Sequence, residues 1–240
     1  MSAPKIAMVL AAGLGKRLRP ITETLPKPLL PIAGATLLDR GLDSLAAAGV
    51  GTAVVNVHHL GDQIVRHVAG RARPKVVVSD ESGRLLDSAG GIVKALPLLG
   101  AAPFFILNAD TFWIDEGEPG LGRLALAWDD ASMDILLMLA RTVDATGHSG
   151  GTDFVIGADG RLARAHGDPA GLIYAGAGIL HPRIFAGAAA EPHSLNLYFD
   201  RALEAGRLYG APMRGRWITV GTPDAIPLAE AAVAAAAKRR

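Results

Sequence analysis

The fold is decided by residues 10–20, which read Leu-Ala-Ala-Gly-Leu-Gly-Lys-Arg-Leu-Arg-Pro. The apolar run at residues 5–11 predicts a buried strand that ends in this glycine-rich turn. The first turn of an open α/β sheet is the usual phosphate site, because backbone amides can approach an anion closely there. Three cations, Lys16, Arg17 and Arg19, follow the glycines. The stretch therefore predicts a site for a strongly anionic phosphate ligand.

Two well-known phosphate motifs do not fit this turn. A Walker loop needs Ser or Thr after Gly-Lys, and Arg17 stands there. A dinucleotide fingerprint needs a third glycine where Leu18 stands, and an acidic residue at the end of the second strand, where residues 56–58 read Asn-Val-His. An ordinary glycine turn with solvated charges is the remaining alternative. The segment 25–31, Leu-Pro-Lys-Pro-Leu-Leu-Pro, disfavours it by adding a further cation, Lys27.

Strands and helices alternate along the first half of the chain. Apolar runs predict strands at residues 5–11, 52–57, 75–79 and 104–107, and helical spacing predicts helices at 36–48, 62–69 and 88–99. This alternation predicts a doubly wound, mostly parallel α/β sheet. After residue 128 the pattern predicts strands at 133–140, 154–156, 162–165 and 173–180, and helices at 194–205 and 223–237. No repeat or linker separates the halves, so we expect the added mixed strands to continue the same domain.

Composition excludes several classes of protein. The chain has 24 Lys and Arg against 23 Asp and Glu, so no overall field favours nucleic acid or an anionic membrane as partner. It has no cysteine, which excludes disulfides, thiolate metal sites and cysteine nucleophiles. It also lacks a secretory signal and an apolar run long enough to span a membrane. We therefore expect a cytoplasmic protein.

The basic turn also carries a family resemblance. Residues 13–20 and 26–29 resemble the activating motif of nucleotide-sugar pyrophosphorylases, which are sugar-1-phosphate nucleotidyltransferases of glycosyltransferase-A-like, Rossmann-like fold. The resemblance covers nearly the whole chain. Within the family it is strongest to the short bacterial N-acetylmuramate-1-phosphate uridylyltransferases, on residues 56–64, 90–100 and 221–222. It implies one domain over residues 1–240, with a nucleotide-binding half at 1–130, and a sugar-binding half and C-terminal helix at 131–240.

The resemblance implies a Mg²⁺-dependent reaction in which a sugar-phosphate oxygen attacks the α-phosphorus of a nucleoside triphosphate and expels pyrophosphate. The favoured pair is UTP with N-acetylmuramic acid 1-phosphate, giving UDP-N-acetylmuramic acid in cell-wall recycling. The alternatives are a mannose- or heptose-1-phosphate guanylyltransferase, and a catalytically weak nucleotide-sugar-binding protein. The base, the sugar and the choice between monomer and small homo-oligomer stay open.

Site residues follow from the same resemblance. It assigns catalytic roles to Arg17, Lys27 and Asp110, with Asp110 as the Mg²⁺ ligand. Nucleotide contacts are expected from Leu10, Ala11, Ala12, Gly13, Gly15, Lys16, Glu81 and Gly90, with Glu81 accepting from the edge of uracil or guanine. Sugar contacts are expected from Asn108, Asp153, Gly176 and Asn196.

The chain departs from the family pattern at one metal position. Thr219 stands where the family has a second metal aspartate. Three outcomes are open: Asp110 suffices with phosphate oxygens and water, Asp224 approaches the metal, or catalysis is lost. We expect the first, because Mg²⁺ accepts a shell built mostly from substrate oxygens and water.

Overall fold

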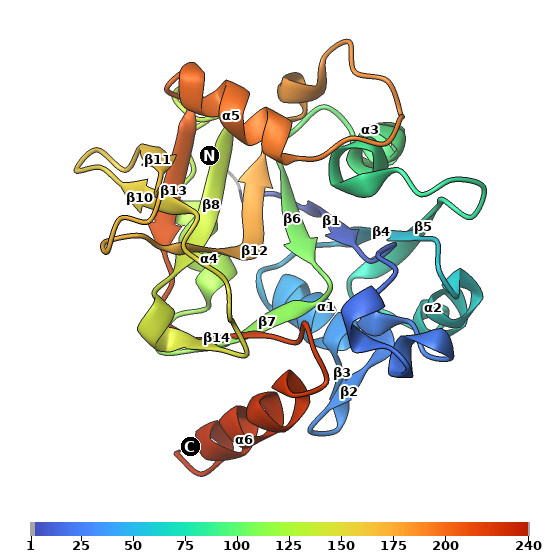
Figure 1. Ribbon diagram of the computed structural model, residues 1–240. Helices are drawn as coiled ribbons and strands as arrows, with labels where there is room; N and C mark the ends of the chain where they lie inside the picture. Colours follow the sequence, from blue (N-terminus) through green and yellow to red (C-terminus); the bar gives the residue numbers. More distant parts are fainter. Residues whose placement is uncertain (1–2, 240) are drawn as a thin grey trace.

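The central sheet of the computed structural model, which describes residues 3–239, has the strand order β13-β8-β12-β6-β1-β4-β5 (Figure 1). Its strands are β1 (Ile6–Leu10), β4 (Thr52–Val57), β5 (Lys75–Asp80), β6 (Phe104–Asn108), β8 (Ile135–Ala140), β12 (Ile173–Leu180) and β13 (Leu208–Pro212). Strand β12 is antiparallel to both of its neighbours, whereas the other pairs are parallel. The mostly parallel sheet is confirmed, and both halves of the chain contribute strands to it.

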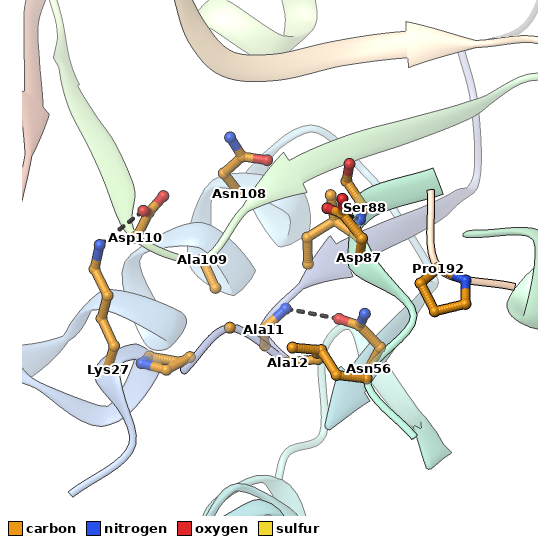
Figure 2. A pocket seen from close by; sticks show the side chains of 14 residues that line it. Ala11, Ala12, Lys27, Asn56, Asp87, Ser88, Asn108, Ala109, Asp110 and Pro192 are labelled. Atoms are coloured by element: carbon orange, nitrogen blue, oxygen red, sulfur yellow. Dashed lines mark hydrogen bonds and ion pairs between the residues drawn. The ribbon is translucent and has the colours of Figure 1, made fainter. Parts of the chain in front are cut away.

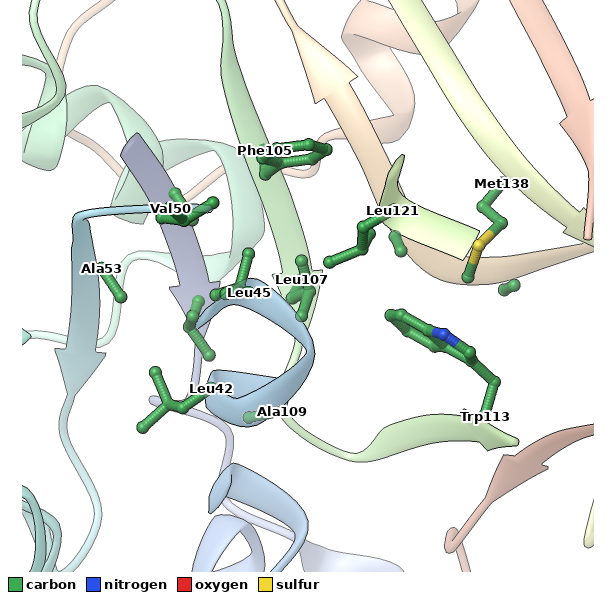
Figure 3. Close-up of a cluster of buried hydrophobic side chains, with 14 of the residues drawn as sticks. Leu42, Leu45, Val50, Ala53, Phe105, Leu107, Ala109, Trp113, Leu121 and Met138 are labelled. Carbon is green, nitrogen blue, oxygen red and sulfur yellow. The ribbon is translucent and has the colours of Figure 1, made fainter. Parts of the chain in front are cut away.

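Helices cover both faces of the sheet. One layer contains α1 (Leu37–Ala47), α2 (Gly61–Val68) and α4 (Gly120–Ala127), and the other contains α3 (Asp87–Leu99) and α5 (Asn196–Glu204). Figure 3 shows the core under α1 and α4. In β6, Phe105 and Leu107 face this core, while Phe104 and Ile106 face α3 and α5. Successive side chains of a strand point to opposite faces, so one apolar run supplies both layers.

A smaller sheet lies beside the main one. It has the order β7-β14-β9, formed by Thr111–Asp115, Gly215–Thr219 and Ala145–Thr146. The last helix, α6 (Ala225–Ala237), packs on it through Ala225 and Ala229, next to Ile218. Two short hairpins complete the strands: β2 (Pro31–Ile32) with β3 (Ala35–Thr36), and β10 (Phe154–Ile156) with β11 (Leu162–Arg164).

The predicted strands and helices are confirmed to within a few residues, but seven further strands and α-helices were not predicted. These are the short strands β2, β3 and β9, together with β7, α4, β13 and β14. Strand β13 contains Gly210 and Pro212, which argue against a central strand; it lies instead at the edge of the sheet, with Pro212 as its last residue. None of the helices within residues 3–239 has the length and apolarity that a membrane span requires.

The core makes a stability prediction. Phe105 has no exposed surface, so Phe105→Ala leaves a cavity between β6 and the α1 layer and is expected to lower the free energy of unfolding by about 3–5 kcal/mol. Leu126→Ala, on α4 at 84% exposure, is the matched control and is expected to change it by at most about 0.5 kcal/mol. Urea denaturation measures both, and equal losses would contradict the placement of this core.

Candidate active site

A cavity of about 500 Å³ opens at the carboxyl ends of β1, β4 and β6 (Figure 2). Strand β1 has β4 on one side and β6 on the other, so the chain order reverses at this point of the sheet. Ligands of open α/β sheets bind at such switch points. The cavity is lined by Leu10, Ala11, Ala12, Gly13, Lys27, Pro28, Asn56, Leu85, Asp87, Ser88, Asn108, Ala109, Asp110 and Pro192.

A buried amide fixes the floor of this cavity. Asn56, 2% exposed, accepts a hydrogen bond from the Ala11 backbone N–H at 2.7 Å and donates one to Glu81 Oε1 at 2.7 Å. Glu81 Oε2 accepts from the backbone N–H of Leu86 at 3.1 Å. These bonds join the end of β1, the end of β4, the turn after β5 and the start of α3. The glycine-rich turn after β1, residues 11–16, is therefore tied to a rigid frame; it is called the phosphate turn below because its sequence predicts phosphate binding.

The position of Glu81 differs from the expectation that this carboxylate reads a base edge. Glu81 is only 1% exposed, does not line the cavity, and both of its oxygens accept hydrogen bonds from the protein. Gly91 packs behind it, where a Cβ would lie 2.6 Å from Oε1. In this structure Glu81 reaches the cavity only through Asn56.

Gly90 also lies elsewhere than expected. It is buried in α3 and does not line the cavity, and a Cβ there would collide with the backbone carbonyl of Glu191. The missing side chain therefore admits the segment before α5, rather than a nucleotide. That segment supplies Pro192 to the cavity wall.

An ion pair stands at one side of the cavity. Lys27 Nζ lies 2.7 Å from Asp110 Oδ2 (Figure 2). The Lys27 side chain is 11% exposed and that of Asp110 is 38% exposed. The pair is partly shielded from water, so the attraction between its two charges is stronger than in bulk water. It places a cation and a carboxylate beside the phosphate turn.

The remaining residues of the basic turn lie outside the cavity lining. Gly15 packs under Thr22, whose hydroxyl donates to the Gly15 carbonyl at 2.9 Å. Lys16 and Arg17 are exposed, and the Arg17 guanidinium rests against Gly221, just beyond β14. The structure thus brings Lys27 to the cavity wall and leaves Lys16 and Arg17 on the surface near it.

A second cavity, of about 240 Å³, adjoins the first, and both are lined by Leu10, Ser88 and Asn108. It brings together three of the four predicted sugar-contact residues, Asn108, Asp153 and Asn196. Its other lining residues are Phe154, Arg164, Tyr174, Ser194, Leu195 and Phe199.

Gly176, the fourth predicted sugar-contact residue, lines neither cavity. It lies in an irregular part of β12 with φ +76°, and a Cβ there would stand 2.5 Å from Thr111 Oγ1. Its role in the structure is to allow this turn of the backbone next to β7.

Comparison with known proteins assigns the family. The model of the nucleotidyl transferase family matches residues 6–146. The chain belongs to this family. The nucleotidyltransferase is 43% identical over 239 residues to the N-acetylmuramate alpha-1-phosphate uridylyltransferase of Caulobacter vibrioides, with 98% of this chain and 99% of that protein covered. It is 32% identical over 219 residues to the protein of the same name from Neisseria meningitidis, with 90% and 93% covered.

Solved structures confirm the fold of the nucleotidyltransferase. HddC from Yersinia pseudotuberculosis, solved in complex with GMP-PN, superposes with a TM-score of 0.76 at 23% identity, over 95% of this chain and 98% of that one. The expected glycosyltransferase-A-like fold is thereby confirmed.

Several cavity residues were not predicted from the sequence. Asn56 entered only as a departure from the dinucleotide fingerprint and as part of the resemblance at residues 56–64, and Asp87, Ser88 and Tyr174 were not predicted as site residues. Asn56 is the last but one residue of β4, and Asp87 and Ser88 begin α3. The rule that sites gather beyond the carboxyl ends of parallel strands would have found these three.

The buried amide makes a prediction about this nucleotidyltransferase. Asn56→Ala leaves the Ala11 N–H and the buried Oε1 of Glu81 each without a partner, so the free energy of unfolding is expected to fall by about 3 kcal/mol. Asn196→Ala, at an exposed asparagine, is the control, with an expected change within about 0.5 kcal/mol. Urea denaturation measures both variants. A loss below about 1 kcal/mol for Asn56→Ala would contradict the inference that this amide fixes the ends of β1 and β4 and the turn after β5.

Proposed function

We propose that this chain transfers a uridylyl group from UTP to N-acetylmuramic acid α-1-phosphate, giving UDP-N-acetylmuramic acid and pyrophosphate. The observation that carries the proposal is the pairing of two adjoining cavities across the Leu10–Asn108 wall, one beside the phosphate turn and one lined by Asp153 and Asn196. The choice of base and sugar rests on the full-length similarity to the Caulobacter vibrioides uridylyltransferase. Such a reaction belongs to cell-wall recycling in the cytoplasm, where UTP is available.

The proposed chemistry needs charge neutralisation and alignment rather than a side-chain nucleophile. A phosphate oxygen of the sugar phosphate attacks the α-phosphorus of UTP; the new O–P bond forms as the bond to the β-phosphate oxygen breaks, and pyrophosphate leaves. Lys27 is placed to neutralise phosphate oxygens from the cavity wall, and Lys16 and Arg17 contribute positive charge from the surface turn. Binding of phosphates would draw Lys27 away from a purely internal pairing with Asp110.

Mg²⁺ fits this cavity as a metal held largely by substrate. Within residues 3–239, no group of three or more His, Cys, Asp and Glu side chains is placed to enclose a metal ion. Asp110 offers a partly exposed carboxylate on the cavity wall, and Mg²⁺ commonly takes one or two protein carboxylates with phosphate oxygens and water. When bound, Mg²⁺ would neutralise charge on the phosphates. Asp110 is the residue that would hold it.

Thr219 is far from Asp110 along the chain, but the smaller sheet brings their backbones together. It pairs with Thr111 in the β7–β14 ladder, and the next residue, Val220, donates its N–H to the Asp110 carbonyl at 3.3 Å. A hydroxyl is a weaker ligand than a carboxylate, so we propose that Asp110 alone anchors the metal from the protein side. The similarity to a full-length uridylyltransferase supports an adapted site over a decayed one.

Pyrophosphate release tests the function. With Mg²⁺ and a grid of nucleoside triphosphates and sugar 1-phosphates, release is expected with UTP plus N-acetylmuramic acid α-1-phosphate. Asp110→Asn is expected to lower kcat at least about 100-fold without loss of folding, because the metal and phosphates lose their anchor. Asp43→Asn, on the exposed face of α1, is the control and should keep the parent rate. Release only with GTP and a mannose or heptose phosphate would replace the proposal by the guanylyltransferase alternative, and no release with any pair would leave a binding protein.

Thr219→Asp tests whether the site is adapted. If Asp110 suffices, restoring the second carboxylate is expected to change kcat by less than about tenfold, since substrate oxygens and water already complete the Mg²⁺ shell. The measurement is kcat as a function of Mg²⁺ concentration for both proteins. A gain of about 100-fold or more would instead mark Thr219 as a lesion in a degenerate enzyme.

A further inference from the structure

Tyr174 carries a buried hydroxyl that the proposed reaction has not used. This oxygen is shielded from solvent and finds no hydrogen-bond partner among residues 3–239. Burying a hydroxyl without a partner is unfavourable, and such groups in native proteins usually serve a purpose. The side chain lines the smaller cavity, together with Asp153 and Asn196. The hydroxyl lies behind the surface of that cavity, so a ligand can supply the missing acceptor once a neighbouring side chain of the lining shifts on binding.

The backbone holds Tyr174 in this position by a distortion of β12. The pairing of β12 with β8 runs from Tyr174 opposite Leu139 to Gly178 opposite Leu137, so β12 has extra residues between these pairs. The Ala175 carbonyl turns out of the ladder and accepts from Trp217 Nε1 at 2.9 Å and from Thr111 Oγ1 at 3.2 Å. Bulges beside active sites commonly redirect a side chain in this way.

The ring itself is also fixed. The Tyr174 backbone N–H donates to Asp153 Oδ2 at 2.8 Å, and the ring packs edge-on against Phe199 with centroids 5.6 Å apart. Backbone and ring are thus fully engaged, and the hydroxyl is the part left without a partner. Since the backbone N–H and the ring are held in place, the missing partner of the hydroxyl does not come from a loosely packed side chain, and we interpret it as a place for a ligand.

The charges around Tyr174 indicate which ligand atom it meets. Burial, and then the carboxylates of Asp110 and Asp153, raise the pKa of the Tyr174 hydroxyl, so at neutral pH it is a hydrogen-bond donor. The same two carboxylates disfavour an anionic oxygen at this point. The one guanidinium in the lining of the cavity, that of Arg164, is already paired with Asp200 at 2.7 Å. A neutral acceptor, such as a ring hydroxyl or an acetamido carbonyl, fits best.

We propose that the Tyr174 hydroxyl donates a hydrogen bond to a neutral oxygen on the sugar of the sugar 1-phosphate, and so positions the acceptor and selects it. The proposal rests on the function proposed above and adds a residue to it. Tyr174 lines the smaller cavity and not the larger one, so its effect falls on the sugar phosphate and not on the nucleotide.

Tyr174→Phe removes the hydroxyl alone. The KM for the sugar 1-phosphate is expected to rise about 5- to 20-fold, on the scale of one lost hydrogen bond, while the KM for UTP stays within about twofold. The Tm of the protein without substrate is expected to stay the same or rise, because no internal bond is lost. Tyr198→Phe is the matched control: the Tyr198 hydroxyl bonds His193 Nε2 at 2.9 Å, so that variant should lose Tm and keep both KM values.

The outcomes separate the two proposals. A Tyr174→Phe enzyme with the parent's KM for the sugar 1-phosphate would overturn the role of Tyr174 and leave the uridylyltransferase function standing. A fall in its Tm without substrate would show that the hydroxyl has an internal partner and would overturn the role as well. If the parent protein turned over no sugar 1-phosphate at all, the proposed function and the role of Tyr174 would fall together.

Discussion

The geometry of the active cavity depends on one buried amide, that of Asn56. Its carbonyl oxygen accepts from the Ala11 N–H and its amino group donates to Glu81, both at 2.7 Å. Among uncharged side chains, only a carboxamide offers an acceptor and two donors on one short, planar group. Because a buried carboxylate and a buried backbone N–H must both find partners, the ends of β1 and β4 and the turn after β5 have one satisfied arrangement. That arrangement holds the phosphate turn in place before any ligand arrives.

The two cavities differ in the charge of the polar groups that they offer to a ligand. The larger one contains the Lys27–Asp110 pair beside the glycine turn, where formal charges can act on phosphates. The smaller one contains the uncharged donor of Tyr174, and its guanidinium is held by a carboxylate of the protein. Under the proposed function, phosphate binding would draw on charge attraction, while sugar recognition would rely on hydrogen-bond geometry. Preorganised polar groups of this kind do not have to be reoriented during the reaction.

Sequence reasoning predicted the regular half of the fold and the wall of the larger cavity. Lys27, Asn108 and Asp110 line that wall, because strand ends and a glycine turn are local features. The second half was harder to read: β13 contains a glycine and a proline, and β7 and β14 pair across about a hundred residues. The family resemblance assigned Glu81 to the base, as an acceptor for the edge of uracil or guanine. Its burial depends on Asn56 and Gly91, a contact between elements that no single segment encodes.

The wall shared by the two cavities has an evolutionary consequence. Leu10, Ser88 and Asn108 line both cavities, so under the proposed function a mutation there is expected to alter recognition of both substrates at once. Asp153, Tyr174 and Asn196 touch only the smaller space. A descendant of this protein could therefore acquire a new sugar by changes at the second group alone, with its nucleotide preference inherited intact. Such modular divergence lets one ancestral scaffold give rise to enzymes that share a nucleotide and differ in the sugar they activate.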